Sequence, residues 1–286
     1  KVVTTKGNYG SEMLYTYEKY YDASDGDSLV TTIDQTVQHY LEKNLETAIE
    51  KYDIINGAFG IVMDVNSGQI LAMANLGSYD PNNYQEIYDQ ALAGQLEAQY
   101  QDALLLDKDS DAYKEAMSAY NQAVAAERLR QWRNRCVSDG YEPGSTFKML
   151  TVLEYMKENP NTWQDYVYNC NGSYQNGDYT IKCYHGTAHG AQNLIQAFAN
   201  SCNGAFAEIG MQINSEKFRA LANQMLFNSE LPYTLPYNQS TFSLDGSSDD
   251  WEKLQTAIGQ GKTQITPLHN LMIVSAIANG GTLMKP

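Results

Sequence analysis

Apolar side chains recur at helical spacing in the first part of the chain. Val37, Leu41, Leu45 and Ile49 follow Asp34 at intervals of four residues. Side chains spaced in this way share one face of a helix, and aspartate directly before such a run is a preferred N-cap. The pattern therefore predicts an amphipathic helix that begins after Asp34.

Two short apolar segments come next, at 58–65 and 69–75, with Asn66-Ser67-Gly68 between them. Short apolar runs on either side of a glycine-containing turn are typical of a β-hairpin. A hairpin next to long helices predicts an α+β fold, in which helices cover an antiparallel sheet.

The longest segment without strand character covers 84–132, which is acidic and rich in Ala, Gln, Glu and Tyr, with a break at 107–111. These helix-forming residues predict a pair of helices. We interpret the pair as a solvated excursion from the domain, with a docking surface for a partner as the alternative. Residues 1–28 are polar and Tyr-rich and are interpreted as a linker at the edge of a membrane-proximal region, entering a domain at 29–286.

Helical periodicity also marks the second half of the chain. Further helices are predicted at 192–200, 204–212, 216–226 and 266–278. Thr266 and Pro267 begin the last of these, and Thr followed by Pro is a preferred N-cap and first helical residue.

A candidate nucleophile lies at Ser145. Pro143 and Gly144 break the preceding structure, and the residues that follow are apolar at helical spacing, so Ser145 is predicted in the first turn of a helix. Lys148, three residues later, shares its face. A neutral lysine amine could accept the serine proton, and both burial and the helix dipole lower the pKa of a lysine at this position.

A second motif, Ser201-Cys202-Asn203, supports this interpretation. About one Ser-x-x-Lys pattern is expected by chance in a chain of this length, so the first motif alone is weak. Together with a later Ser-x-Asn triplet, however, it supplies two of the three elements, Ser-x-x-Lys, Ser-x-Asn and Lys-Thr-Gly, that form the signature of penicillin-binding proteins and class A β-lactamases.

From about Thr31 to its end, the chain resembles the transpeptidase domain of a class B, monofunctional penicillin-binding protein. The matching segments are Thr31–Gln38, Asn134-Arg135, Glu142–Lys148, His189-Gly190, Ser201–Asn203, Ala257–Gly261, Ile265–Leu268 and Ala278–Gly281. The resemblance implies the serine β-lactamase/penicillin-binding transpeptidase fold, with helices on both faces of an antiparallel sheet.

The resemblance also implies an activity, peptidoglycan D,D-transpeptidation through a serine acyl-enzyme. Ser145 would be the nucleophile, Lys148 its base and Ser201 a proton relay to the leaving group, while Asn203 would bind the substrate. The implied ligands are stem peptides that end in D-Ala-D-Ala and β-lactam antibiotics, and a glycosyltransferase is a possible partner in wall synthesis.

The third motif of the family, Lys-Thr-Gly on a sheet-edge strand, does not occur in these 286 residues. In the family this strand binds the substrate carboxylate and supplies part of the oxyanion hole. We expect either that the chain ends before it or that it lies elsewhere in the protein. Gly261-Lys262-Thr263 is interpreted as a loop, since it directly precedes the helix predicted at Thr266.

Other functions remain open at this stage. A class D-like β-lactamase shares the nucleophile, although Asn203 replaces the apolar residue typical of that class. A penicillin sensor and a non-catalytic cell-wall scaffold are further alternatives. The sequence separates neither transpeptidation from D-Ala removal nor roles in division, elongation and sporulation.

Composition limits the partners and the location. The net charge of −15, from 19 basic and 34 acidic residues, argues against nucleic acid, which needs clustered Lys and Arg. No apolar run reaches membrane-spanning length. By resemblance, we expect a single N-terminal membrane anchor upstream of Lys1 and a catalytic domain outside the cytoplasm.

No cofactor and no metal are expected. The four cysteines, Cys136, Cys170, Cys183 and Cys202, show no C-x-x-C spacing typical of zinc sites. Cys170 and Cys183 flank a hairpin-like loop and could form a disulfide. His185 and His189 are four apart, but the glycines beside them argue against a helix that presents two metal ligands.

Overall fold

The structure, a computed structural model, describes residues 2–3, 19–20, 26, 28–55, 57–77 and 79–286. Two units make up the chain, Lys1–Thr32 and Ile33–Pro286. In the first, β1 (Val2–Val3) pairs antiparallel with β2 (Lys19–Tyr20). The linker predicted at 1–28 lies mostly outside the described residues.

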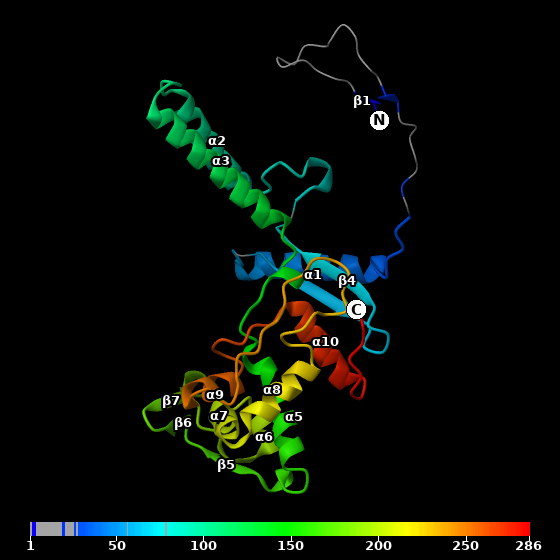
Figure 1. The fold of residues 1–286 in the computed structure, drawn as a ribbon, viewed down its shortest axis with the longest axis vertical. Helices are drawn as coiled ribbons and strands as arrows, with labels where there is room; N and C mark the ends of the chain where they lie inside the picture. Colours follow the sequence, from blue (N-terminus) through cyan, green and yellow to red (C-terminus); the bar gives the residue numbers. More distant parts are fainter. Residues whose placement is uncertain (1, 4–18, 21–25, 27, 56, 78) are drawn as a thin grey trace. The chain divides into compact units, whose positions relative to one another are not determined.

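Helix α1 of the second unit begins where the sequence predicts (Figure 1). It spans Gln35–Tyr52, and the carboxylate of Asp34 accepts hydrogen bonds from the backbone N–H groups of Thr36 and Val37 at 2.8 and 3.0 Å. These bonds satisfy two of the donors that a helix start leaves unpaired. The predicted N-cap is confirmed.

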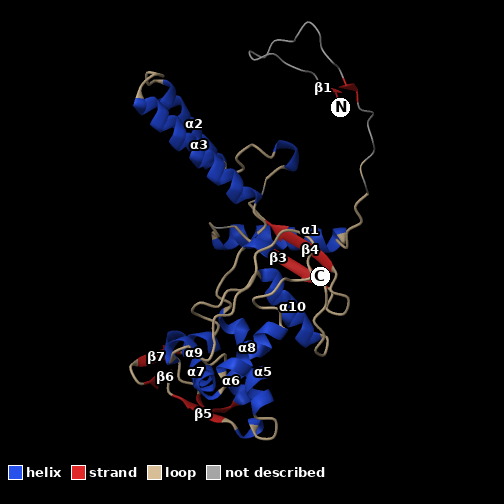
Figure 2. Ribbon diagram, in the orientation of Figure 1, coloured by secondary structure: helices blue, strands red, loops and turns tan. Residues whose placement is uncertain are grey.

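The predicted hairpin is also confirmed, as strands β3 (Phe59–Met63) and β4 (Ile70–Asn75), paired antiparallel. Figure 2 shows this pair with α1 on one side and α10 (Pro267–Ala278) on the other. The short helix α4 (Arg135–Ser138) also contacts both strands.

Residues of β3 divide between the two helices. Gly60 lies close to Leu41 of α1, whereas Met63 packs in one buried cluster with Leu268 and Met272 of α10. Apolar burial of this kind is the main favourable term in folding and fixes which face of the strand meets which helix. An antiparallel sheet is thus covered by helices on both faces, and the predicted α+β fold class is confirmed.

The helix pair predicted within 84–132 is present. Helices α2 (Gln90–Leu104) and α3 (Asp111–Trp132) contact one another, and the ring centroids of Tyr100 and Tyr120 lie 5.1 Å apart. The break between the helices falls at 105–110, close to its predicted place. Before α2, a 3₁₀ turn, η1, spans Pro81–Asn83.

A second helix-rich region carries both candidate motifs. Its helices are α5 (Lys148–Glu158), α6 (Leu194–Ala199), α7 (Asn203–Gln212), α8 (Ser215–Gln224) and α9 (Asp250–Ala257). Its strands are β5 (Val167–Cys170) paired with β8 (Gly190–Asn193), and β6 (Ser173–Asn176) paired with β7 (Tyr179–Lys182). Its 3₁₀ turns are η2 (Gly144–Phe147), η3 (Trp163–Asp165) and η4 (Tyr184–Gly186). The predicted helices of this region and α10 are confirmed, whereas α9 was not predicted.

Helix α9 was not predicted because the residues before it are typical of a turn. The residues before it are Gly246-Ser247-Ser248, which favour turns. The Asp249 carboxylate nevertheless accepts a hydrogen bond from the Glu252 N–H at 2.8 Å and caps the helix. Buried Leu254 then anchors it against α7.

Phe147 anchors the turn of the candidate nucleophile in an aromatic core. Its ring lies 6.0 Å from that of Phe242 in a stacked arrangement, and 5.8 and 5.9 Å from those of Phe218 and Phe227. All four rings are buried. Aromatic rings bury more apolar area than other side chains and prefer such defined geometries, so the backbone on both sides of Phe147 is held firmly.

Candidate active site

Ser145 and Lys148 lie at a junction of two helix types. The sequence predicts an α-helix from Ser145, but the structure has the 3₁₀ turn η2 there, and α5 begins at Lys148. In a 3₁₀ helix, side chains three apart eclipse one another. The Lys148 Nζ therefore lies 3.2 Å from the Ser145 Oγ, and the predicted pairing of the two side chains is present.

A glycine contact holds this turn in place. The N–H of Gly144 donates to the Gly259 carbonyl at 2.7 Å. Gly259 has a φ of +75°, and any Cβ there would collide with the carbonyl oxygen of Gly144. Only glycine fits such a position without strain. The run Ala257–Gly261 thus acts as a support for the nucleophile's turn.

Lys148 is almost completely buried, with 1% of its surface exposed. Its Nζ donates to the Ser201 carbonyl at 2.8 Å and to the Asn203 Oδ1 at 2.6 Å, and it lies 3.0 Å from the Ser201 Oγ. No carboxylate is among its hydrogen-bond partners in the described part of the chain. Burial lowers the pKa of Lys148 to about 8, because the ammonium form loses solvation and the nearby thiols of Cys202 and Cys183 offset this loss only in part.

The Ser201–Asn203 motif reaches the lysine from a strained bend before α7. Ser201 has a φ of +50°, an uncommon value for a residue with a side chain. This conformation brings the Ser201 Oγ to 2.9 Å from the Ser145 Oγ. The Asn203 side chain links Lys148 to strand β7, since its Nδ2 donates to the Lys182 carbonyl at 3.0 Å while its Oδ1 accepts from the Lys148 Nζ.

This arrangement can remove a proton from Ser145. A neutral lysine amine has two N–H groups and one lone pair, and two of its partners, the Ser201 carbonyl and the Asn203 Oδ1, can only accept. With both N–H groups used there, the lone pair faces the hydroxyls of Ser145 and Ser201. Ser145 itself is exposed to solvent, so a substrate can reach it. The site combines an accessible nucleophile with a buried base.

Two other candidates have different surroundings. Lys262 is exposed, with 75% of its side chain accessible, and its Nζ lies 3.5 Å from Glu252. Cys170 and Cys183 are free thiols, with their Sγ atoms 3.6 Å apart. Sequence reasoning missed one neighbour of the base, Phe206, whose ring centroid lies 5.4 Å from the Lys148 Nζ. Phe206 is four residues after Cys202, and in the sequence this position predicts only a buried apolar residue of the helix, not a neighbour of the base.

The family follows from a match over most of the chain. Residues 58–286 match the penicillin binding protein transpeptidase domain, so the chain belongs to this family. The class B resemblance predicted from the sequence is thereby confirmed.

Named relatives agree with this assignment. Stage V sporulation protein D of Bacillus subtilis is 28% identical over 98% of this chain and 39% of its own length. Peptidoglycan D,D-transpeptidase PbpA of Mycolicibacterium smegmatis is 29% identical over 79% of this chain and 41% of its own length. The chain therefore spans about two fifths of the length of these relatives.

Solved structures share the fold. The imipenem acyl-enzyme of penicillin-binding protein A from M. tuberculosis superimposes with a TM-score of 0.65 at 24% identity, covering 90% of this chain and 53% of that one. The D,D-transpeptidase domain of a peptidoglycan glycosyltransferase from Eggerthella lenta gives a TM-score of 0.65 at 22% identity, covering 99% of this chain and 68% of that one. The predicted penicillin-binding fold is confirmed.

Proposed function

We propose that this protein is a peptidoglycan D,D-transpeptidase that acts through an acyl-enzyme on Ser145. One observation carries the proposal: the Nζ of Lys148, buried without a carboxylate partner, lies 3.2 Å from the exposed Ser145 hydroxyl. Relatives that bear the name peptidoglycan D,D-transpeptidase support this reaction class.

The first half of the reaction transfers the substrate to the enzyme. The Ser145 Oγ attacks the carbonyl carbon between the two D-alanines, and its proton passes to Lys148. The oxygen that gains negative charge is stabilised by the backbone N–H of Ser145, at the start of η2. The C–N bond then breaks, and Ser201, 2.9 Å from the Ser145 Oγ and 3.0 Å from the Lys148 Nζ, relays the proton to the departing D-alanine.

In the second half, an amine of a neighbouring stem peptide attacks the ester. It loses a proton to Lys148, and the Ser145 Oγ leaves and regains a proton by the same relay. Asn203 keeps one amide N–H and one lone pair beyond its bonds to Lys148 and Lys182, and these can hydrogen-bond the substrate backbone and fix its register.

The wider setting is part of the proposal. The substrate is a stem peptide ending in D-Ala-D-Ala, and β-lactams acylate the same serine. We place the catalytic domain outside the cytoplasmic membrane, held by a single N-terminal anchor, with a glycosyltransferase as a working partner. None of the helices among the described residues is long and apolar enough to cross a membrane.

The test is covalent labelling of the native protein by benzylpenicillin. We expect intact mass to increase by one penicillin per chain and peptide mapping to place it on Ser145. The adduct should persist after free drug is removed, because no carboxylate that could activate a water is among the hydrogen-bond partners of the Ser145 Oγ, the Ser201 Oγ or the Lys148 Nζ in the described part of the chain. Rapid loss of the adduct with hydrolysis of the drug would identify a β-lactamase instead, and absence of labelling would point to a non-catalytic scaffold.

The rate of acylation should depend on pH through Lys148. Its pKa is lowered to about 8, and only the neutral amine can accept the Ser145 proton. We therefore expect the second-order rate of penicillin acylation to rise tenfold per pH unit below this value and to level off above it. Stopped-flow labelling with a fluorescent penicillin measures the profile. A rate that stays constant across this range contradicts the role of Lys148 as the base.

A further inference from the structure

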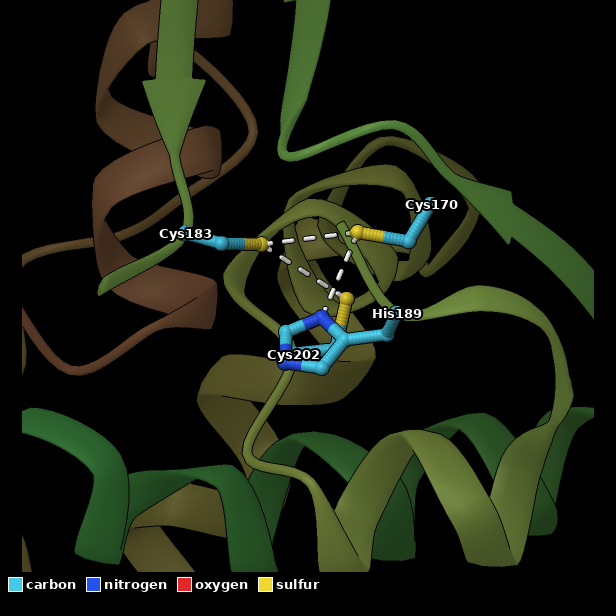
Figure 3. A group of neighbouring side chains, drawn as sticks. All are labelled: Cys170, Cys183, His189 and Cys202. Atoms are coloured by element: carbon cyan, nitrogen blue, oxygen red, sulfur yellow. Dashed lines mark hydrogen bonds between the residues drawn. The ribbon is translucent and has the colours of Figure 1, made fainter. Parts of the chain in front are cut away.

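Four side chains that can bind metal meet beside the candidate active site. Cys170 ends β5, Cys183 follows β7, His189 precedes β8, and Cys202 is the N-cap of α7. Figure 3 shows their sulfur and nitrogen atoms pointing toward a common centre, and these ligand atoms all lie within 4.8 Å of one another. We call these residues the Cys₃His cluster.

Three separations in the Cys₃His cluster are close to the edges of a tetrahedral metal site, and the other pairs of ligand atoms lie within 4.8 Å. The Sγ of Cys183 lies 3.6 Å from the Sγ of Cys170 and 3.8 Å from that of Cys202, and the Nδ1 of His189 lies 3.3 Å from the Cys170 Sγ. With Zn–S bonds of about 2.3 Å and a Zn–N bond of about 2.0 Å, neighbouring ligand atoms lie about 3.5 to 3.8 Å apart. Only small shifts are needed to accommodate an ion.

A disulfide explains the cluster less well. All four cysteines of the chain are free, and a disulfide needs its sulfurs about 2.0 Å apart. A bond between Cys170 and Cys183 would leave the third thiol and the histidine still facing the same point. Three buried thiols and an imidazole around one centre form instead a complete donor set for structural zinc.

The backbone around the sulfurs is arranged to support thiolates. The N–H of Gly172 points at the Cys170 Sγ at 3.4 Å, and the N–H of Ala205 points at the Cys202 Sγ at 3.5 Å. Hydrogen bonds to ligand atoms orient them and stabilise their charge when a metal binds.

We propose that the Cys₃His cluster binds one zinc ion, which fixes Ser201 and Asn203 against Lys148. Cys202 lies between these two residues of the motif, while the other three ligands come from the β5–β8 region. The ion would tie the motif to that region as a closed four-ligand site, and the thiol protons would be released on binding. The zinc-binding part of the proposal is independent of the proposed function, whereas the positioning part rests on it.

Metal binding is tested with matched pairs of variants. Cys183→Ser and His189→Asn remove ligands, whereas Cys136→Ser changes a buried thiol outside the cluster and His185→Asn changes a histidine four residues away. We expect one zinc per chain in the reduced parent and in both controls, and affinity weakened on the order of 100-fold or more in the ligand variants. Cobalt should give the visible absorption of a tetrahedral thiolate site in the parent and controls alone.

Several results would overturn zinc binding. They are a reduced parent that takes up neither zinc nor cobalt, ligand variants that bind as tightly as the controls, and a native protein whose cluster thiols are joined in a disulfide. Ser145→Ala should bind zinc as tightly as the parent. A failure of zinc binding can therefore be distinguished from a failure of the proposed catalysis.

Positioning is tested by acylation rates. Removal of zinc from the parent by a chelator should slow labelling by a fluorescent penicillin at least tenfold, and added zinc should restore the rate, because the Ser201 and Asn203 contacts to Lys148 loosen without the ion. The controls should respond in the same way. An unchanged rate after zinc removal would reject the positioning role while leaving the metal site intact.

Discussion

A Ser145→Ala variant is expected to lose all covalent labelling by benzylpenicillin while keeping its fold. The Ser145 hydroxyl is exposed, lies 3.2 Å from the Nζ of Lys148, and belongs to a residue whose backbone N–H is near the start of η2. Alanine removes the attacking oxygen and its contacts with Lys148 and Ser201, while the aromatic core around Phe147 still holds the turn. Intact mass after drug exposure measures the loss, and thermal unfolding checks the fold.

A second serine makes this experiment sharper. The Ser201 Oγ also contacts Lys148, at 3.0 Å, and is exposed, so it is the natural competitor as nucleophile. If Ser201 acts only as a proton relay, its removal should slow labelling without preventing it. Ser201→Ala should therefore still be labelled on Ser145, on the order of 100-fold more slowly than the parent. Residual labelling of Ser145→Ala that maps to Ser201 would reverse the two assigned roles.

Replacing Lys148 by methionine should slow acylation about a thousandfold, the range lost when a general base is removed. Methionine keeps the length and apolar stem of the side chain, so the contact with Phe206 survives. The free energy of unfolding should change little, because relief of the desolvation cost of a buried cation offsets the loss of its hydrogen bonds to the Ser201 carbonyl and the Asn203 Oδ1. Labelling rates and urea denaturation measure the two effects.

The control for this variant is Lys217→Met, which removes an exposed lysine of α8 whose Nζ lies 3.5 Å from Glu158. It should alter neither the labelling rate nor stability by more than a few tenths of a kcal/mol. A large loss of stability in Lys148→Met, parallel to its loss of activity, would show that the lysine acts as a structural residue and not as the base.

Local signals explain which parts of the fold could be predicted from the sequence. The Asp34 cap, the turn at 66–68 and the Thr266-Pro267 start are each set by side chains within a few residues of one another. The pairing of Ser145 with Lys148 is local as well, because three residues of helix bring them together whether the turn is α or 3₁₀. Such features depend little on the rest of the chain.

Features set by distant contacts were not predictable. Strands β5 and β8 have four residues each and pair across an intervening hairpin, so neither carries a periodic signal of its own. The Cys₃His cluster is similar, since its members are 13, 6 and 13 residues apart in sequence and meet only in the folded chain, from the ends of β5, β7, β8 and α7. The expectation of no metal relied on the absence of C-x-x-C spacing. This criterion detects only metal sites whose ligands are close together in the sequence.

The aromatic anchor at Phe147 has a consequence for drug resistance under the proposed function. Substitutions that displace Phe218, Phe227 or Phe242 would shift the turn between Ser145 and Lys148 without touching either residue. Such changes would slow acylation by antibiotic and by stem peptide together, because both use the same serine. Selection under β-lactams should therefore leave this aromatic core unchanged and act on residues that contact only the drug.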